Sequence, residues 1–520
     1  MQPGEFAAVS LVDGDDGVAI ATADGTTMHR DSDALPSLRE LDDAGARFVW
    51  WSARETIRSW SAAGWRPRAC WDIEAVSRLL HGDDRDLPRP PSGDMLDFAA
   101  NAENPSPERS REIALEQLTA LRALPDPRPA PTAVPLALLT AYAESAAAVL
   151  AVELEHTGLP VDVDAMTAIL RPIIGERPVD DRHAGATKRA RDDAVLRLFP
   201  HSDDVDLRNP AQVREMLARI GLDLPDTRSW RLEPHVETSP PVRALVAWRK
   251  AERLATTYGW GWLDRDVGGD GRLRGVWNAA EGAGRMTASA GLHNMPAELR
   301  SAVRANPGWV FVGADLGQVE PRVLAAVSGD GALAAAARQD DMYAPVAAAL
   351  RCDRPTAKVA VLAAMYGGTS GAAATALRDM DRAYPTAMAY LRAAEEAGRS
   401  GRDLRTYGGR LLPLRRALED SRYPPMSWGR FARNAVVQGA AAELFKAWAG
   451  TVRAGLPPTG AEIVLCLHDE LLVHAPADSA SGVAELVRAS LAQTAHWWAA
   501  GSGVRFVAEV AIGETWAEAH

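Results

Sequence analysis

The 520-residue sequence predicts a chain of mixed α+β class with more than one domain. Three observations support this prediction. A proline-rich stretch, RALPDPRPAPTAVP at 122–135, has the composition of a semi-rigid linker. Residues 136–265 repeat apolar side chains at spacings of three and four, which is typical of helices. From about residue 266, short apolar runs that suit strands alternate with helical patterns.

Composition excludes several classes of protein. With 47% hydrophobic residues the chain is globular, and we expect no transmembrane helix because no long uncharged apolar run is evident. We do not expect the start, MQPGEFAAVSLVDGDDG, to be a signal peptide, because it has no basic region followed by an apolar core. Three scattered cysteines, Cys70, Cys352 and Cys466, support no zinc or disulfide framework and suit a reducing cytoplasm. A net charge of −12 argues against a protein that is basic throughout, but it allows a local nucleic-acid surface.

The region 136–265 contains recognisable helices. The stretches at 136–158 and 240–259 both have the periodicity of an amphipathic helix. Asn209 followed by Pro210 predicts a capped helix start, and the pattern that follows ends at Gly221.

Two isolated carboxylates stand at predicted strand ends. The run WVFVGA (309–314) leads to Asp315, and a helical pattern follows from Val319. The runs IVLCL (463–467) and LLV (471–473) predict two strands joined by a tight turn that contains Asp469. If these strands are neighbours, both acids emerge at one sheet edge, where they could hold two divalent metals about 3.5–4 Å apart. Magnesium suits such oxygen ligands. The structural alternative is that Asp315 caps the following helix and Asp469 occupies an ordinary turn.

A third feature is the stretch RPTAKVAVLAAMYG (354–367). The chain has only four lysines among its 57 cationic residues, so Lys358 inside an apolar helix suggests a role that guanidinium fills badly. Arg354, Lys358, Leu362 and Tyr366 are spaced by four and form one helical stripe. Asp353 is a candidate cap and Pro355 suits the first turn. The stripe fits a polyphosphate at one end and a planar group at the other, although a solvated helix face explains the spacing equally well.

These segments, in order, resemble family A DNA polymerases of the bacterial DNA polymerase I type. DLGQVEPR (315–322) is similar to the first palm motif, 354–367 to the fingers helix motif and HDE (468–470) to the second palm motif. Flanking similarities are GRMT (284–287) with LHNMP (292–296), RFARNAVVQG (430–439), LPVD (159–162) and TTY (256–258). The resemblance covers about 136–520.

The resemblance implies a right-hand polymerase fold: an antiparallel palm sheet with helical fingers and thumb. Its implied divisions are a degenerate exonuclease-like domain of RNase H type at 1–121, the linker at 122–135, thumb and palm entry at 136–280, and palm and fingers at 281–520, with the fingers at about 330–425. It implies template-directed addition of deoxynucleotides to a primer, by a cytoplasmic monomer acting on nucleoid DNA.

The resemblance also implies residue roles. Asp315 and Asp469 hold two magnesium ions, and Lys358 acts as an acid toward the leaving pyrophosphate. Glu320 excludes the ribose 2′-hydroxyl. The implied nucleotide-binding residues are Gln318, Glu320, Tyr343, Arg354, Lys358, Leu362 and Tyr366. The implied DNA-binding residues are Arg285, Arg430, Asn434, Gln438 and His468, and the amides of Asn434 and Gln438 suit minor-groove acceptors that every correct base pair shares.

The sequence departs from the family pattern at several positions. Leu316 and Gly317 replace Tyr-Ser, Pro321 replaces an aliphatic residue, Tyr343 replaces a phosphate-contacting His, and Leu362 replaces Phe or Tyr. None of these changes removes an implied metal ligand, so activity is still expected.

The N-terminal segment resembles the family's proofreading exonuclease only in outline. No Asp-x-Glu follows its first apolar strand, no middle acid is apparent near Trp51, and no counterpart of the last motif is evident, which indicates a deletion. Asp72 and Glu74 are either a displaced nuclease motif or helix-start acids favoured by the dipole. We therefore expect no proofreading.

Three other functions remain open at this stage. A single-subunit RNA polymerase shares the palm and fingers chemistry, but Glu320 favours deoxynucleotide selection. A two-metal nuclease would not need the 354–367 helix. A non-catalytic DNA-binding relic is disfavoured by the intact Asp315 and Asp469.

Overall fold

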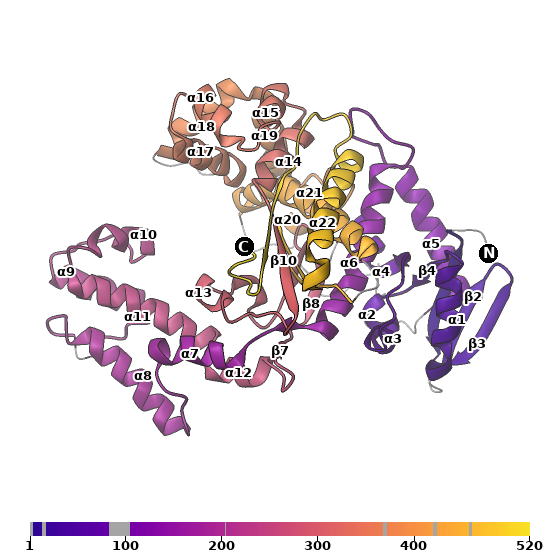
Figure 1. The fold of residues 1–520 in the computed structure, drawn as a ribbon. Helices are drawn as coiled ribbons and strands as arrows, with labels where there is room; N and C mark the ends of the chain where they lie inside the picture. The colour runs from indigo at the N-terminus through magenta and orange to yellow at the C-terminus, as the bar shows by residue number, and fades with distance from the viewer. Residues whose placement is uncertain are drawn as a thin grey trace. The chain divides into compact units, whose positions relative to one another are not determined.

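The computed structural model describes residues 4–12, 17–82, 105–202, 204–367, 372–419, 424–456 and 460–520 (Figure 1). The chain forms two compact units. The first comprises Met1–Leu159, Val276–Ser289 and Ala305–His520, and the second comprises Pro160–Gly275 and Ala290–Arg304. Each unit is therefore built from more than one stretch of sequence.

The N-terminal part of the first unit is a mixed five-stranded sheet. Its strands are β1 (Phe6–Val12), β2 (Gly17–Thr22), β3 (Gly25–Arg30), β4 (Arg47–Trp50) and β5 (Cys70–Asp72), in the order β3-β2-β1-β4-β5. β1–β2 and β2–β3 are antiparallel, whereas β1–β4 and β4–β5 are parallel. The associated helices are α1 (Asp31–Asp43), α2 (Ala53–Thr56), α3 (Arg58–Ala62), α4 (Ile73–His81) and α5 (Pro107–Arg122). Phe48, Trp50 and Trp71 fill the two cores of this sheet.

Helix α6 (Leu136–Thr157) joins this sheet to the rest of the unit. Its apolar side chains enter both cores of the sheet, and the helix also packs on α21 (Pro425–Gly455). By length and composition α6 could cross a membrane, but 78% of its most apolar window is buried in the fold. Its Glu144 pairs with Arg410 at 2.7 Å and with Lys446 at 2.5 Å, and all three side chains are buried. Burial alone would raise the pKa of Glu144, but these cations hold it below its usual value.

The central sheet of the first unit has four antiparallel strands. They are β13 (Glu462–Cys466), β14 (Glu470–Pro476), β10 (Trp309–Leu316) and β15 (Ala508–Gly513), in the order β13-β14-β10-β15. Helix α22 (Ala480–Trp498) packs across β10, β14 and β15, after the short helix η3 (Ala477–Ser479). The hairpin of β8 (Trp277–Glu281) and β9 (Arg285–Ala288) belongs to the same unit. The strands predicted from WVFVGA, IVLCL and LLV are confirmed.

A helical body fills most of 319–455. It contains α14 (Val319–Ser328), α15 (Gly331–Ala336), α16 (Tyr343–Leu350), α17 (Arg354–Tyr366), α18 (Ala372–Ala383), α19 (Pro385–Ser400), α20 (Leu414–Glu419) and α21, with the small hairpin β11 (Leu404–Arg405) and β12 (Leu411–Leu412). The Asp353 side chain accepts from the Thr356 N–H at 2.8 Å, and Gly367 ends α17 at a φ of 71°. The predicted helix and its cap are therefore confirmed.

Asp330 connects two helices of this body. One carboxylate oxygen caps α15 by accepting from the N–H groups of Ala332 and Leu333, at 3.1 and 3.0 Å. The other accepts from the N–H groups of Thr386 and Ala387 at the start of α19, both at 3.1 Å. One buried carboxylate thus satisfies the free N–H groups of two helix starts.

The second unit is mainly helical. After β6 (Leu159–Pro160) it contains α7 (Val163–Ile174), α8 (Asp181–Leu196), α9 (Pro210–Arg219), α10 (Ser229–Leu232), η1 (Glu233–His235), α11 (Pro240–Thr257), α12 (Trp260–Asp266), β7 (Arg272–Leu273), η2 (Leu292–Asn294) and α13 (Ala297–Arg300). Asn209 caps α9 through the N–H groups of Ala211 and Gln212, as predicted. The helices predicted at 136–158 and 240–259 correspond to α6 and α11.

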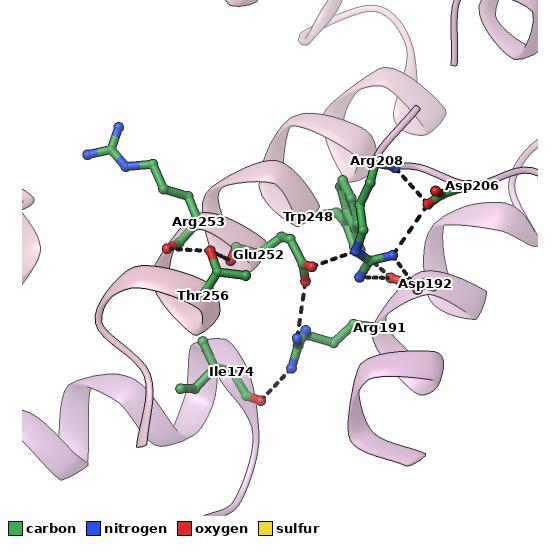
Figure 2. Close-up of polar contacts among 9 residues, drawn as sticks. All are labelled: Ile174, Arg191, Asp192, Asp206, Arg208, Trp248, Glu252, Arg253 and Thr256. Atoms are coloured by element: carbon green, nitrogen blue, oxygen red, sulfur yellow. Dashed lines mark hydrogen bonds and ion pairs between the residues drawn. The ribbon is translucent and has the colours of Figure 1, made fainter. Parts of the chain in front are cut away.

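A polar network connects α8, α11 and the loop before α9 (Figure 2). Arg208 binds Asp192 through both Nη atoms, at 2.8 and 3.2 Å, and donates through Nε to Glu252 at 2.7 Å. Its guanidinium also lies 5.2 Å from the centre of the Trp248 ring. Trp248 in turn donates to Asp192 at 2.8 Å. A bidentate pair that is also stacked needs arginine rather than lysine.

Candidate active site

Asp315 and Asp469 are brought to the same edge of the central sheet. Asp315 lies near the end of β10, where it pairs with Glu470, the first residue of β14. The Leu316 N–H donates to the carbonyl oxygen of Asp469 at 2.8 Å. The prediction that the two acids come from neighbouring strands is confirmed. Asp315 is not a helix cap, because α14 starts from Gln318 without any side-chain cap bond.

Negative charge accumulates around Asp315. Burial and then the neighbouring carboxylates Asp469 and Glu470 raise the pKa of Asp315 to about 6. Glu509 pairs with Asp315 across the β10–β15 ladder. In this register Glu470, Asp315 and Glu509 share one face of the sheet, because directly paired residues point the same way. A divalent cation would relieve this repulsion, so the carboxylates fit a metal site. Within the described ranges, no three His, Cys, Asp or Glu side chains are already grouped around a metal position.

Glu470 is a further candidate site residue, which the sequence analysis did not select. Its side chain is buried at 3% relative exposure. The Trp516 indole N–H donates to its carboxylate, and the His520 Nδ1 lies 3.3 Å from the same oxygen. The one sequence signal that could have identified Glu470 as a site residue is its position directly after Asp469. Its partners lie about 50 residues away along the chain, so spacing could not identify them.

A second cluster surrounds Glu320. Arg285 of β9 donates to one oxygen of the Glu320 carboxylate at 2.5 Å, and the Tyr366 hydroxyl of α17 donates to the other at 2.7 Å. Burial and then the Glu320 carboxylate raise the pKa of Tyr366, whose side chain also bonds Gln438 of α21. The structure therefore brings together four of the predicted site residues, from four separate elements.

The Arg354 side chain is held by an acid that the sequence analysis did not select. Its Nε and Nη2 donate to the two oxygens of Asp341, at 2.7 and 3.2 Å, and it lies 5.6 Å from the centre of the Tyr343 ring. This pairing lowers the pKa of Asp341. Gln318 donates to Asp341 at 3.0 Å and accepts from the Met342 N–H at 2.9 Å. Three predicted nucleotide-binding residues thus meet at one loop.

Arg322 holds the loop that precedes Asp341 in place through hydrogen bonds to its backbone. It is fully buried, and its guanidinium donates five hydrogen bonds to backbone carbonyls. The acceptors are Gly317, Ala337, Gln339, Asp340 and Arg505, at 2.5–3.0 Å. Because all its donors are satisfied by backbone, Arg322 shapes the loop before Asp341 rather than binding a ligand.

The predicted stripe of α17 is the exposed face of that helix. Ala357, Ala360, Val361, Ala364 and Met365 are buried on the other side. Lys358 is exposed and forms no ion pair with any residue that the structure describes. Leu362 is half-buried one turn later, and Tyr366 is exposed. This arrangement leaves the Lys358 ammonium available to a ligand.

The remaining predicted DNA-binding residues lie on α21 and in the β13–β14 turn. Arg430 is exposed and Asn434 and Gln438 are half-buried. The Asn434 Oδ1 atom is buried and has no hydrogen-bond partner among the described residues. Burial and then the nearby Arg285 lower the pKa of His468. His468 therefore lies in the same electrostatic environment as the Glu320 cluster.

Asp72 in the N-terminal sheet is held by hydrogen bonds that stabilise the fold. Its carboxylate accepts from the Ala53 and Ala75 N–H groups, at 2.7 and 2.9 Å, and from the Trp50 indole at 3.2 Å. Burial raises its pKa to about 7. Asp72 thus caps α4, which supports the helix-start explanation over a displaced nuclease motif. The expectation about a motif after the first strand concerns residues 13–16, which lie outside the described residues, and the expected loss of the last motif stays a prediction.

Comparison with known proteins finds similarity over the part of the chain that contains the candidate site. Residues 199–518 match the model of DNA polymerase family A. DNA polymerase I of Chloroflexus aurantiacus is 32% identical over 291 residues, covering 49% of this chain and 30% of that protein. Thermostable DNA polymerase I of Thermus thermophilus is 27% identical over 412 residues, which cover 70% of this chain and 47% of that protein. The matches thus span about a third to a half of these relatives' length.

One solved structure is similar along the whole chain. The POL domain of Pol1 from M. smegmatis, in complex with DNA primer-template and dNTP, superposes with a TM-score of 0.69 at 21% identity. The match covers 100% of this chain and 96% of that one. At this identity the likeness is one of fold.

Proposed function

Because the chain belongs to DNA polymerase family A, we propose that it is a DNA-directed DNA polymerase that adds deoxynucleotides to a primer 3′ end. The observation that carries this proposal is the pairing of β10 with β14, which places Asp315 beside Asp469 and Glu470. The Glu320 cluster is consistent with it, as is Lys358, which has no ion-pair partner among the described residues. In this assignment the primer–template duplex and deoxynucleoside triphosphates are the substrates.

Members of family A use divalent metal ions, and we assign two magnesium ions to Asp315 and Asp469. Carboxylate oxygens are the ligands that magnesium prefers. The raised pKa of Asp315 is consistent with this: burial, and then the neighbouring acids, destabilise its charged form, and a bound cation would offset the repulsion from those acids. When bound, the ions supply the charge neutralisation that in-line phosphoryl transfer requires.

The chain's own residues would bind and orient the nucleotide. Arg354 would exchange its pairing with Asp341 for the triphosphate, with Gln318 and Tyr343 at the same loop. Lys358 would give a proton to the leaving pyrophosphate. Leu362 and Tyr366 would line the sugar and base of the incoming nucleotide. Arg285 and Tyr366 hold the Glu320 carboxylate in place. This carboxylate would leave no room for the 2′-hydroxyl of a ribonucleotide.

The primer–template duplex would lie along Arg285, Arg430, Asn434, Gln438 and His468. Asn434 and Gln438 are one turn apart on α21, so both amides face one side of the helix. Amides can donate to minor-groove acceptors that all correct pairs share, which checks pair geometry without reading sequence. The Asn434 Oδ1 atom has no hydrogen-bond partner among the described residues, so this acceptor is available to a donor on a ligand.

We assign the parts of the chain as thumb and palm entry for 136–280 and palm and fingers for 281–520, with the fingers near 330–425. The N-terminal 1–121 would be an exonuclease-like module without proofreading activity. The mixed order β3-β2-β1-β4-β5, with parallel pairs on one side only, supports an RNase H-type origin. The polymerase would act as a cytoplasmic monomer on nucleoid DNA.

A primer-extension assay tests the function. The protein is incubated with a 5′-labelled primer on a longer template, all four deoxynucleotides and magnesium, with chelated magnesium as the control. We expect extension to the template end that depends on magnesium. The absence of any extended product from folded protein would refute the proposal.

Replacing Glu320 should relax sugar selection. Glu320→Ala removes the carboxylate that Arg285 and Tyr366 fix, so space and hydrogen-bonding freedom appear beside the sugar. We expect the ratio of kcat/KM for ribo- over deoxynucleotides to rise by at least about tenfold, at some cost in rate. Glu320→Gln serves as the bulk-preserving control and should change the ratio less. An unchanged ratio in the alanine variant would favour an RNA polymerase instead.

The N-terminal module should not degrade primers. In the absence of nucleotides, a mismatched primer 3′ end should remain intact in the presence of magnesium. Asp72→Asn should lower the free energy of unfolding by about 1–3 kcal/mol, because an amide group would face N–H donors in a buried site. It should not alter nuclease activity. Magnesium-dependent shortening that persists in Asp315→Ala would show a working second site.

A further inference from the structure

Residues 515–520 form a hydrogen-bonded turn next to the candidate metal site. The Glu518 carboxylate accepts from the N–H groups of Glu514 and Thr515, at 2.9 and 3.2 Å. The Thr515 carbonyl accepts from the N–H groups of Glu518 and Ala519, at 3.2 and 3.1 Å. These bonds join the start of the 515–520 turn to Glu518 and Ala519, so the turn can hold its side chains in a fixed direction.

The central sheet has a glycine where the 515–520 turn crosses it. A Cβ atom on Gly313 of β10 would lie 1.8 Å from the Ala519 carbonyl oxygen, and one on Gly513 of β15 would lie 2.4 Å from the Glu518 Cβ. Gly313 is two residues before Asp315, so a side chain there would point to the same face of the sheet. A glycine inside a strand often marks a close backbone approach. Here it lets the turn lie against the face that carries Asp315.

The 515–520 turn directs two polar groups at one carboxylate. The Trp516 ring is fully buried, and its N–H donates to the Glu470 Oε1 atom. His520 Nδ1 lies 3.3 Å from that same atom. Without such partners the Glu470 carboxylate would be repelled by Asp315 and Asp469 and would turn away from them. The contacts from the turn thus hold the Glu470 carboxylate in place against repulsion by Asp315 and Asp469.

We propose that the 515–520 turn is a positioning element of the metal site, which holds the Glu470 carboxylate beside Asp315 and so sets the affinity of the site for divalent cations. This inference rests on the proposed function. In this proposal Trp516 and His520 act through the Glu470 carboxylate rather than on the substrate. Partners that orient the carboxylates of a metal site commonly change its affinity by about 10- to 100-fold when they are removed.

The test compares two tryptophans. Trp516→Phe removes the indole N–H and keeps an aromatic ring. The matched control is Trp498→Phe, because Trp498 is 2% exposed and its N–H has no hydrogen-bond partner among the described residues. Binding of Mn²⁺ is measured by electron paramagnetic resonance of the free ion, without nucleotide turnover, and each Tm is recorded.

We expect Trp516→Phe to bind Mn²⁺ about tenfold more weakly, and Trp498→Phe to bind it as the unmodified protein does. His520→Ala, at an exposed position, should weaken binding in the same direction and covers the case in which Trp516→Phe does not fold. Unchanged Mn²⁺ affinity in the folded variants, or an equal loss in Trp498→Phe, would overturn the inference. Primer extension by the unmodified protein separates this outcome from failure of the proposed function.

Discussion

Asp315→Ala and Asp469→Ala are each expected to slow nucleotide addition by at least about a thousandfold, which corresponds to about 4 kcal/mol of transition-state stabilisation. The physical reason is that each change removes one of the two carboxylates that β10 and the β13–β14 turn place at one sheet edge. Primer–template binding should stay within a few-fold of the unmodified protein, because it depends mainly on phosphate contacts.

Single-turnover extension and a binding titration separate these two effects. Glu485→Ala serves as the control, since Glu485 is an exposed acid on α22 with 77% of its side chain accessible. It should leave both quantities unchanged. Turnover close to that of the unmodified protein in Asp315→Ala or Asp469→Ala would show that these acids do not form the metal site.

Lys358→Arg should lower kcat by at least about a hundredfold, the range expected for loss of a general acid, with only a few-fold change in nucleotide KM. The charge is kept, but guanidinium does not release its proton at neutral pH. Lys358 is suited to this role because its exposed ammonium pairs with no acid in the described parts of the chain.

Arg354→Lys provides the contrasting case. Arg354 presents two N–H groups as a fork, as its pairing with both oxygens of Asp341 demonstrates, and lysine cannot reproduce that geometry. We expect nucleotide KM to rise more than kcat falls. Pre-steady-state measurement of both variants tests the division of roles. A rate unaffected by Lys358→Arg would reduce Lys358 to a phosphate anchor.

The parts of the fold that could be predicted from sequence are those with local signals. The strand that ends near Asp315, the helix capped by Asp353 and the helix capped by Asn209 all depend on residues within a few positions of each other. The same is true of the four-residue spacing from Arg354 to Tyr366, which correctly predicted one stripe along a helix.

The features that sequence did not predict depend on packing between distant segments. Asp341 meets Arg354 only because buried Arg322 gathers the carbonyls of the preceding loop and of Arg505. Trp516 reaches Glu470 only because Gly313 leaves room for the 515–520 turn. Neither relationship has a fixed spacing, so no periodicity could indicate it.

The structure explains what surrounds two residues that depart from the family pattern, Tyr343 and Gly317. Tyr343 is buried at 4% exposure, and its ring lies under the Arg354 guanidinium. The Gly317 carbonyl accepts from Arg322, and a Cβ atom there would lie 3.0 Å from the Val507 side chain. Tyr343 thus offers Arg354 a stacking surface, and Gly317 permits close packing behind the site.

Template direction is the central claim, and single-nucleotide incorporation tests it most directly. Four primed templates that differ only in the first unpaired base are each incubated with one deoxynucleotide at a time, in magnesium. We predict that kcat/KM for the complementary deoxynucleotide exceeds that for each mismatched one by at least about a hundredfold on every template, a discrimination of about 2.7 kcal/mol. Incorporation that ignores the template base, or none at all with any of the four, would contradict the account.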